Sequence, residues 1–316
     1  MREGAAEPVR RGRAGHPLRR PSSLIDWARG ALADAGIGSP RADAEVLLGQ
    51  ALGVERSEVR RLRVLDREVG DDVAEAFAGL VGRRAAREPL QHLTGVAWFR
   101  HLELAVGPGV FVPRPETEVV AQVAIDEAEA VVAQRGAAVV VDLCAGSGAI
   151  ALAVATEVPG ARVHAVELDA AAHAWTARNV AAVSGAGEPV VRLVRGDART
   201  ALADLDGQVD VVVSNPPYVP PGAVPHDPEV AEHDPAVALY GLGEDGLEVP
   251  RGITAAAARL LRPGGLYVME HAEVQDAAAR AMVDATGRFE RAVTVDDLTG
   301  RPRMVVARKA AASLAD

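Results

Sequence analysis

After residue 115 the chain alternates between two hydrophobic periods, one typical of strands and one typical of helices. Segments with helical spacing, such as "GAIALAVATEV" and "AAAHAWTARNVAAV", separate short apolar runs. Strands that alternate with helices predict a doubly wound α/β sheet with parallel strands. The last two runs stand close together, so we expect an antiparallel pair at one end of the sheet. The runs are residues 137–144, 161–168, 189–196, 209–215, 264–271, 289–295 and 303–309.

In the first third of the chain, apolar positions recur at the i, i+3 and i+4 spacing of helices. A first helix is expected to begin after Ser22 or Ser23, either of which could be its N-cap. A second helix is expected to end at Leu52, and a third before Pro89. We therefore expect a small helical domain at residues 23–89, in which no catalytic constellation is evident.

Two other segments differ from both patterns. Apolar and polar positions alternate over residues 90–113 around a Gly-Pro-Gly turn, which predicts a β-hairpin connector between domains.

Residues 1–22 carry six arginines without apolar periodicity, and we expect a disordered extension because they cannot bury a core. A targeting peptide and a basic arm that contacts RNA are the alternatives, whereas no apolar segment supports a secretory signal.

Composition narrows the classes of function. The 316 residues carry a formal net charge of -10, which argues against a large nonspecific nucleic-acid surface. Cys144 is the single cysteine, so an internal disulfide is impossible and a reducing cytoplasm fits. No apolar run approaches the roughly 18–20 residues that span a bilayer. We expect a cytoplasmic protein that neither enters a membrane nor binds nucleic acid stably.

Three successive strand ends carry the side chains of a nucleoside pocket. The first strand is expected to end at Asp142, and the glycines of residues 146–148 then lead into a helix, where the backbone can approach a ligand. A glycine turn alone is also an ordinary structural turn. Glu167 ends the second run and is placed to bind both ribose hydroxyls, and Asp197 after the third could meet an adenine amine. Asp169 is expected to cap the following helix.

This pocket lacks the features of phosphoryl transfer. The chain has neither a G-x-x-x-x-G-K-[ST] loop nor G-x-G-x-x-G spacing, and we expect no magnesium-type acidic cluster or other metal site. S-adenosylmethionine fits better, since it has a nucleoside and a cationic sulfonium but no phosphates. Asp142 would then face the amino group of its methionyl part.

The fourth run ends abruptly in "SNPPYVPP". Pro216 and Pro217 cannot continue a sheet ladder, although Asn with Pro-Pro is also ordinary turn chemistry. Beside a methyl donor, Asn215 Oδ1 and the Pro216 carbonyl could accept both N–H hydrogens of a planar nitrogen and aim its lone pair at the methyl group. Tyr218 could pack against the planar group. Catalysis would then depend on orientation and proximity, worth on the order of 7–11 kcal/mol, without a strong base.

The Asn-Pro-Pro-Tyr corner resembles the signature of S-adenosylmethionine-dependent methyltransferases that act on planar nitrogens. Further stretches narrow the resemblance to the protein-(glutamine-N5) methyltransferases of peptide chain release factors, and together they span roughly residues 24–309. They are "EPLQHLTG" (88–95), "VFVPRPETE" (110–118), "EHDPAVALYGLGEDGL" (232–247), "RPGGLYVMEHAEVQ" (262–275) and "DLTGRPR" (297–303).

The resemblance implies a helical N-terminal domain that helps to grip the release factor, and a Rossmann-like class I methyltransferase domain at residues 114–316. The donor would be S-adenosylmethionine and the product S-adenosylhomocysteine. The substrate would be the glutamine of the release factor's Gly-Gly-Gln loop. We expect the enzyme to act as a monomer.

Carried over position by position, the resemblance also implies the site residues. Asn215, Pro216 and Tyr218 would be catalytic, and Arg114 and Glu118 are expected to bind substrate with Asn215, Pro216, Pro217 and Tyr218. The donor would be bound by Asp142, Cys144, Ala145, Gly146, Ser147, Gly148, Glu167, Asp197, Ala198 and Asn215.

Three features depart from the family pattern, and one is that the loop after the third run, "GDARTALADL", lacks an aromatic residue that some members place beside the adenine. The family often has glycine where this chain has Cys144, so a positive φ there would be strained and could change donor affinity. We expect the Cys144 thiol to be a buried, inert side chain. The arginine-rich residues 1–22 have no counterpart in the family.

Two other functions remain open from the sequence. Methylation of adenine N6 or guanine N2 in nucleic acid would use the same corner, but we find no separate basic target-recognition domain. A noncatalytic protein that only binds the donor is the third possibility. The intact Asn215 and Tyr218 argue against it, because a degenerate site would be free to lose them.

Overall fold

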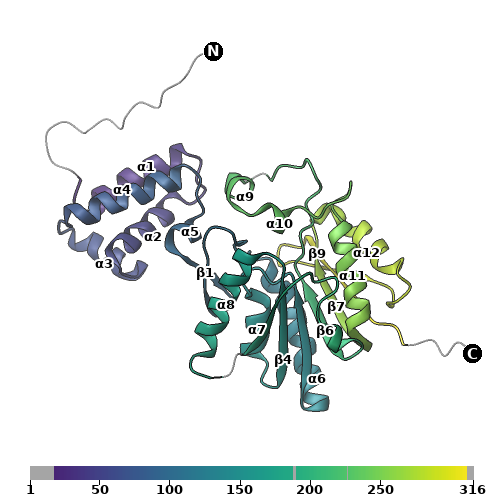
Figure 1. Ribbon diagram of the computed structural model, residues 1–316. Coiled ribbons are helices and arrows are strands. Elements are labelled where there is room, and N and C mark those ends of the chain that lie inside the picture. Colours follow the sequence, from purple (N-terminus) through teal and green to yellow (C-terminus); the bar gives the residue numbers. More distant parts are fainter. Residues whose placement is uncertain (1–17, 188–189, 226, 312–316) are drawn as a thin grey trace, which may run out of the picture. The chain divides into compact units, whose positions relative to one another are not determined.

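The computed structural model describes residues 18–187, 190–225 and 227–311 (Figure 1). The chain forms two compact units, Met1–Thr94 and Gly95–Asp316, each with a hydrophobic core of its own. Most of the extension that we expect to be disordered lies outside the described residues.

The N-terminal unit is a helical bundle around an apolar core. Leu32, Leu47, Leu48 and Phe77 are fully buried in this core. The helical spacing of the sequence therefore corresponds to one apolar face on each of the longer helices. The helices are α1 Pro21–Asp34, α2 Pro40–Leu52, α3 Arg56–Leu65, α4 Asp71–Ala85 and α5 Leu90–Thr94.

Helix α1 begins earlier than its sequence suggests. Arg20 is the N-cap and Pro21 is the first helical residue. Proline is favoured at this position because its φ is already helical and its missing N–H would have no partner. The Ser22 N–H donates to Asp66 Oδ1 at 3.0 Å. The prediction that Ser22 or Ser23 caps this helix is therefore wrong.

The C-terminal unit is built on a seven-stranded sheet in the order β5-β4-β3-β6-β7-β9-β8. The first five strands in this order are parallel, and β9 is antiparallel to both β7 and β8. Both the doubly wound α/β sheet and the antiparallel pair at one end are confirmed. The strands are β3 Ala138–Leu143, β4 Ala161–Glu167, β5 Val191–Arg195, β6 Val209–Ser214, β7 Leu261–Glu270, β8 Val293–Asp296 and β9 Pro302–Arg308.

Helices cover both faces of this sheet, and alternate side chains of its strands enter two separate cores (Figure 1). Val140 and Val211 face the core formed with α6 and α7, whereas Val141 and Val212 face the core formed with α11. Central parallel strands are apolar on both faces for this reason. The helices are α6 Thr117–Arg135, α7 Ala149–Glu157, α8 Ala170–Ser184, α9 Pro228–His233, α10 Ala236–Leu239, α11 Glu248–Leu260 and α12 Asp276–Asp284, with 3-10 turns η1 Ala203–Leu205 and η2 Glu273–Gln275.

The hairpin that we expect at residues 90–113 is shorter than that segment. Strands β1 Val96–Phe99 and β2 Leu102–Ala105 pair antiparallel, and the residues before them form α5. The hairpin belongs to the C-terminal unit by its contacts. Among the described residues, no helix is both long and apolar enough to cross a membrane.

A buried carboxylate in β6 links three strands at the edge opposite their carboxyl ends. Asp210 is 1% exposed, and its Oδ2 accepts the Val139 N–H at 2.7 Å. Its Oδ1 accepts Arg135 Nη1 at 2.5 Å and also Arg262 Nε. Because these donors belong to β3, α6 and β7, one side chain helps to align the elements around β6.

Replacing Asp210 with alanine is expected to lower the free energy of unfolding by about 3 kcal/mol, because a buried N–H and two guanidinium groups lose their acceptor. Urea denaturation followed by circular dichroism measures the change. Asp204→Ala is the matched control, since Asp204 pairs with Arg192 at 2.9 Å on the surface and should contribute less than about 1 kcal/mol. Equal losses in the two variants would contradict this assignment.

Candidate active site

The carboxyl ends of the parallel strands bring most of the predicted site residues to one edge of the sheet. Strand β3 lies between β4 and β6, so the chain connections leave it in opposite directions and open a crevice there. Leu143 of β3 and Ser214 of β6 are partners in the ladder. Cys144 and Asn215 therefore follow side by side at the centre of the edge.

The turn after β3 has three residues in left-handed backbone conformation: Cys144 at φ 70°, Gly146 at 58° and Gly148 at 84°. A Cβ on Gly148 would lie 2.8 Å from Thr176 Cγ2, so close packing on α8 requires glycine. A Cβ on Gly146 would meet nothing within 4 Å, so space is open beside it. The Cys144 and Ala145 N–H groups both donate to the Val166 carbonyl, at 3.1 and 3.0 Å, which holds the turn against β4.

Cys144 is the strained member of this turn. Cys144 adopts the positive φ at which a non-glycine residue is expected to be strained. The strain arises because its Cβ lies too close to the backbone in this conformation. Burial raises the pKa of the Cys144 thiol well above its ordinary value, and the nearby Glu167 carboxylate adds to this effect. A thiol held protonated in this way is a poor nucleophile.

Glu167 at the end of β4 is fixed by the backbone on both sides. Its Oε2 accepts the Gly146 N–H and its Oε1 accepts the Asp169 N–H, both at 2.8 Å. Burial raises the pKa of this carboxyl group. Each carboxylate oxygen retains further acceptor capacity, as binding of ribose hydroxyls would require. Asp169 caps α8 by accepting the Ala171 and Ala172 N–H groups, which confirms that prediction.

Asp142 has an unused acceptor deep in the pocket. Its Oδ2 accepts the Ala151 N–H at 3.1 Å, whereas Oδ1 is buried without a hydrogen-bond partner among the described residues. Burial raises the pKa of Asp142 to about 7. A cationic donor would satisfy Oδ1 and favour the ionised carboxylate. The residues present therefore fit the ammonium end of a methionyl group.

Asp197 and Ala198 follow β5, and their roles toward adenine stay predictions. The Asp197 carboxylate binds the Arg199 side chain, with Nη2 to Oδ2 at 2.6 Å, and this interaction holds the pKa of Asp197 below its usual value. Ala198 is buried beside it. An adenine amine would thus meet a carboxylate that is already ionised and oriented by Arg199.

The Asn-Pro-Pro-Tyr corner after β6 is held by the segment at residues 239–246. The Tyr218 and Val219 N–H groups donate to the Leu239 carbonyl at 3.1 and 2.8 Å. A Cβ on Gly241 would lie 2.7 Å from the Pro217 carbonyl oxygen, and one on Gly246 would lie 2.4 Å from that of Tyr218. Gly241 and Gly246 of "YGLGEDGL" are therefore required as glycines because this segment packs closely against the corner.

A chain of hydrogen bonds joins both ends of the corner to a buried carboxylate. Asn215 Nδ2 donates to Thr117 Oγ1 at 3.3 Å, and Thr117 Oγ1 donates to Glu270 Oε2 at 2.7 Å. The Tyr218 hydroxyl donates to Glu270 Oε1 at 3.2 Å. In its ionised form Glu270 only accepts hydrogen bonds, and it then fixes the direction of the whole chain. Asn215 must present its nitrogen to Thr117, which leaves Oδ1 for another donor.

Glu270 ends β7 and is 2% exposed. Burial raises its pKa to about 7, while the hydrogen bond from Thr117 and the positive charge of Arg303 oppose that rise. Arg303 is itself held by Asp297, with Nη2 to Oδ2 at 3.2 Å. The "DLTGRPR" stretch therefore positions Arg303, whose positive charge stabilises the ionised form of Glu270.

Thr117 and Glu270 are site residues that the sequence analysis does not single out. Thr117 stands in a helix N-terminal pattern and Glu270 closes an apolar strand, so neither departs from an ordinary structural role. Both lie inside stretches that carry the family resemblance, Thr117 in "VFVPRPETE" and Glu270 in "RPGGLYVMEHAEVQ", and Glu270 also ends a parallel strand at the edge where ligands bind.

Arg114 and Glu118 are not joined to the corner by any hydrogen bond or ion pair in the described part of the chain. Arg114 Nη2 donates to Asp234 Oδ2 at 2.6 Å, and its guanidinium lies 4.9 Å from the centre of the Phe111 ring. The bond to Asp234 connects the "VFVPRPETE" segment to the "EHDPAVALYGLGEDGL" segment. Their predicted roles in substrate binding stay predictions.

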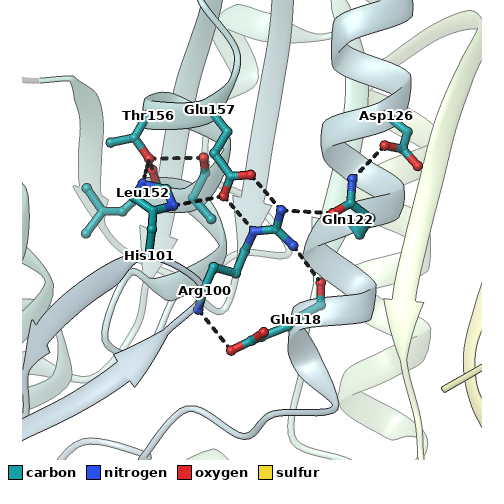
Figure 2. Close-up of polar contacts among 9 residues, drawn as sticks. Arg100, His101, Glu118, Gln122, Asp126, Leu152, Thr156 and Glu157 are labelled. Carbon is teal, nitrogen blue, oxygen red and sulfur yellow. Dashed lines mark hydrogen bonds and ion pairs between the residues drawn. The ribbon is translucent and has the colours of Figure 1, made fainter. Parts of the chain in front are cut away.

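Glu118 is held by the turn of the β1–β2 hairpin, as Figure 2 shows. Its Oε1 accepts the Arg100 N–H at 2.9 Å, and Arg100 Nη1 donates to the Glu118 carbonyl at 3.4 Å. The same guanidinium binds Glu157 of α7 through Nε and Nη2, at 2.5 and 2.6 Å, and Gln122 at 2.8 Å. Arg100 thus fixes the first turn of α6, which carries Thr117.

Comparison with known proteins agrees with this geometry. The family model for the PrmC N-terminal domain matches residues 23–95, and the model for the methyltransferase small domain matches residues 115–230. A release factor glutamine methyltransferase of Streptomyces coelicolor is 50% identical over 280 residues, covering 88% of this chain and 94% of the relative.

Two further relatives cover similar shares of the chain. A release factor glutamine methyltransferase of Bifidobacterium longum is 45% identical over 294 residues, covering 90% of this chain and 98% of the relative. A 4-amino-L-phenylalanine/4-methylamino-L-phenylalanine methyltransferase of Streptomyces pristinaespiralis is 44% identical over 275 residues, covering 86% and 89%.

The raised pKa of Glu270, about 7 in the folded protein, predicts a pH-dependent stability. The Glu270 carboxyl group ionises near pH 4.5 in the unfolded chain but only near pH 7 in the folded protein. The folded state therefore loses stability as the pH rises between these values. We expect the free energy of unfolding to fall by about 1–3 kcal/mol from this group alone.

Urea denaturation of the wild type and Glu270→Gln between pH 5 and 8 measures this effect. The variant loses hydrogen bonds at every pH, so the slope against pH and not the absolute stability is the readout. A flatter profile in Glu270→Gln is expected, with Asp204→Asn as an exposed control that keeps the wild-type slope. Parallel profiles for the wild type and Glu270→Gln would show that this carboxyl group is already ionised at pH 5.

Proposed function

This chain belongs to the release factor glutamine methyltransferase family, and on that premise we propose that it methylates the glutamine of the Gly-Gly-Gln loop in peptide chain release factors. The methyl group goes to the N5 side-chain amide. S-adenosylmethionine is the methyl donor and S-adenosylhomocysteine the product. The observation that carries the proposal is the Asn215 amide, anchored through its nitrogen with Oδ1 left for a substrate N–H.

The corner orients a nitrogen that is otherwise a weak nucleophile. In a side-chain amide the nitrogen lone pair is delocalised into the carbonyl group, and both N–H bonds lie in the amide plane. Asn215 Oδ1 and the Pro216 carbonyl accept these two hydrogens and direct the lone pair out of the plane, toward the methyl group. Such positioning can supply on the order of 7–11 kcal/mol of the barrier reduction.

The surrounding contacts keep the two acceptors rigid. Gln275 Nε2 donates to the Tyr218 carbonyl at 2.8 Å, and the prolines restrict the backbone between Asn215 and Tyr218. The Tyr218 ring, with its hydroxyl held by Glu270, packs against the planar amide of the substrate. The glutamine nitrogen loses one N–H proton to water as it gains the methyl group, so no strong base is needed.

The donor fits the residues around the β3 turn. When bound, S-adenosylmethionine supplies an electrophilic methyl group on a sulfonium. Asp142 receives its ammonium group, Glu167 its ribose hydroxyls, and Asp197 with Ala198 its adenine. The backbone from Cys144 to Gly148 would hold the methionyl part, and Asn215 would contact both donor and substrate.

The remaining assignments follow from the same function. Residues 23–89 serve in recognition of the release factor, residues 90–113 connect the domains, and residues 114–316 form the methyltransferase domain. Arg114 and Glu118 position the segment that carries Thr117 and so contribute to substrate binding. The enzyme acts in the cytoplasm as a monomer and holds no nucleic acid stably, in line with its net charge of -10.

A second candidate function rests on the relative from Streptomyces pristinaespiralis, whose name specifies a 4-amino-L-phenylalanine substrate. The aniline nitrogen of that compound is also planar and carries two N–H hydrogens, so the same acceptors would suit it. The two substrates differ greatly in size, which makes them easy to separate by assay.

Mass spectrometry of a release factor incubated with enzyme and S-adenosylmethionine tests the function. One added methyl group on the Gly-Gly-Gln glutamine is expected, with no transfer to 4-amino-L-phenylalanine, RNA or DNA. Asn215→Ala should lower turnover by about 100-fold, because one acceptor of the reacting amide is lost. Donor binding by calorimetry should fall far less than turnover, because Asn215 is only one of several donor-binding residues, and the melting temperature should not change. Transfer to one of the other substrates alone, or equal turnover by Asn215→Ala, would overturn the proposal.

Thr117 offers a separate test of how Asn215 is oriented. Thr117→Val keeps the shape of the side chain but removes the hydroxyl that links Asn215 to Glu270, so the amide can rotate and offer its nitrogen to the substrate. We expect kcat to fall about 10–100-fold with donor affinity unchanged. Thr117→Ser keeps the hydroxyl and should retain most of the activity. Equal kcat in the two variants would exclude this role for Thr117.

A further inference from the structure

Four arginines surround one buried carboxylate in the N-terminal unit. The Glu45 side chain is 5% exposed and lies on α2. Arg56 binds its Oε2 through Nε and Nη2, both at 2.9 Å, and Arg60 Nε lies 3.5 Å from the same oxygen. Arg41 and Arg63 lie 3.5 and 3.6 Å from Oε1.

The four arginines carry more positive charge than the Glu45 carboxylate can neutralise. One carboxylate cannot neutralise four guanidinium groups, so a net charge of about +3 remains at the cluster. Arg56 and Arg60 both bind Oε2 of the carboxylate, whereas Arg41 and Arg63 lie near Oε1. Arg41 and Arg63 make no hydrogen bond to it, and among the described residues Glu45 is their one ion-pair partner.

The arginines line an open hollow of about 630 Å³ between α2 and α3. Their side chains remain accessible, with exposed fractions of 58% for Arg41 and 36% for Arg63. Val64 lines the same hollow and is 85% exposed, and Leu65 next to it is 50% exposed. Unused guanidinium donors therefore stand beside exposed apolar side chains.

We propose that this hollow, formed by Arg41, Arg56, Arg60, Arg63 and Val64, docks an acidic segment of the protein substrate. The inference rests on the proposed function, because it takes the release factor as the partner. An aspartate or glutamate of the partner enters between Arg41 and Arg63, and an apolar neighbour covers Val64. Guanidinium groups bind carboxylates through paired N–H groups, and arginine is enriched in protein interfaces.

The surroundings favour a protein over the phosphates of a nucleic acid. The chain as a whole carries a net charge of -10, which argues against a large nonspecific nucleic-acid surface. Apolar side chains as exposed as Val64 and Leu65 match a protein surface better than a sugar–phosphate backbone. Charge of this kind speeds association and makes it depend on salt.

The test compares Arg41→Ser/Arg63→Ser with Arg29→Ser/Arg162→Ser in the full-length enzyme. Both double variants remove two surface arginines, of which Arg63 alone is half-buried, and only the first pair lines the hollow. We expect KM for a release factor to rise at least about 10-fold in the first variant, with kcat and donor affinity unchanged and a weaker dependence of KM on salt. The control variant should behave as the wild type.

A third variant, Arg41→Lys/Arg63→Lys, keeps the charge and should retain most of the affinity, which separates a docking role from damage to the fold. Wild-type KM in Arg41→Ser/Arg63→Ser would overturn the docking site while leaving the proposed function intact. The docking site would also be overturned if Arg41→Ser/Arg63→Ser lost binding of an RNA oligonucleotide but kept binding of the release factor. Failure of the wild-type enzyme to methylate any release factor would instead reject the proposed function.

Discussion

The buried carboxylate of Glu270 determines the geometry on which the proposed chemistry depends. Two hydroxyl groups, from Thr117 and Tyr218, donate to its two oxygens. In its ionised form Glu270 only accepts hydrogen bonds, so both hydroxyls donate to it and the Asn215 amide presents its nitrogen to Thr117 and its oxygen outward. The orientation of a neutral amide is thus decided by a charge that contacts neither substrate nor donor.

The same requirement explains why distant segments meet at this point. Thr117 opens α6, Glu270 ends β7, and Arg303 on β9 brings a positive charge toward the carboxylate. Arg100 reaches from the hairpin turn to the first turn of α6, and so supports Thr117 from outside (Figure 2). A weak nucleophile gains most from exact placement, and placement needs support from several elements.

The donor pocket contains two features that destabilise the free protein. Asp142 keeps a buried oxygen without a partner, and Cys144 adopts a backbone conformation that favours glycine. Both features cost stability in the free protein, and strain of this kind concentrates at functional sites. A bound cation would remove the first cost, whereas the second stays with the chain whether or not the donor is present.

The hydrophobic periods of the sequence determined the α/β sheet, its antiparallel end and the helical N-terminal region, because strand and helix periods are local properties. The glycine turn, Glu167 and the Asn-Pro-Pro-Tyr corner could be recognised for the same reason, since each follows directly on an apolar run. Local patterns were less reliable at the start of α1, where Pro21 and not a serine begins the helix.

What only the tertiary structure decided is which side chains cooperate across the sheet edge. Thr117 and Glu270 lie 153 positions apart in the chain, and each looks ordinary in its own segment. Arg114 and Glu118 look like substrate ligands in sequence, yet their partners are Asp234 and Arg100. Hydrogen bonds between distant segments depend on how strands are ordered in the sheet, and that order cannot be read from the period of any single segment.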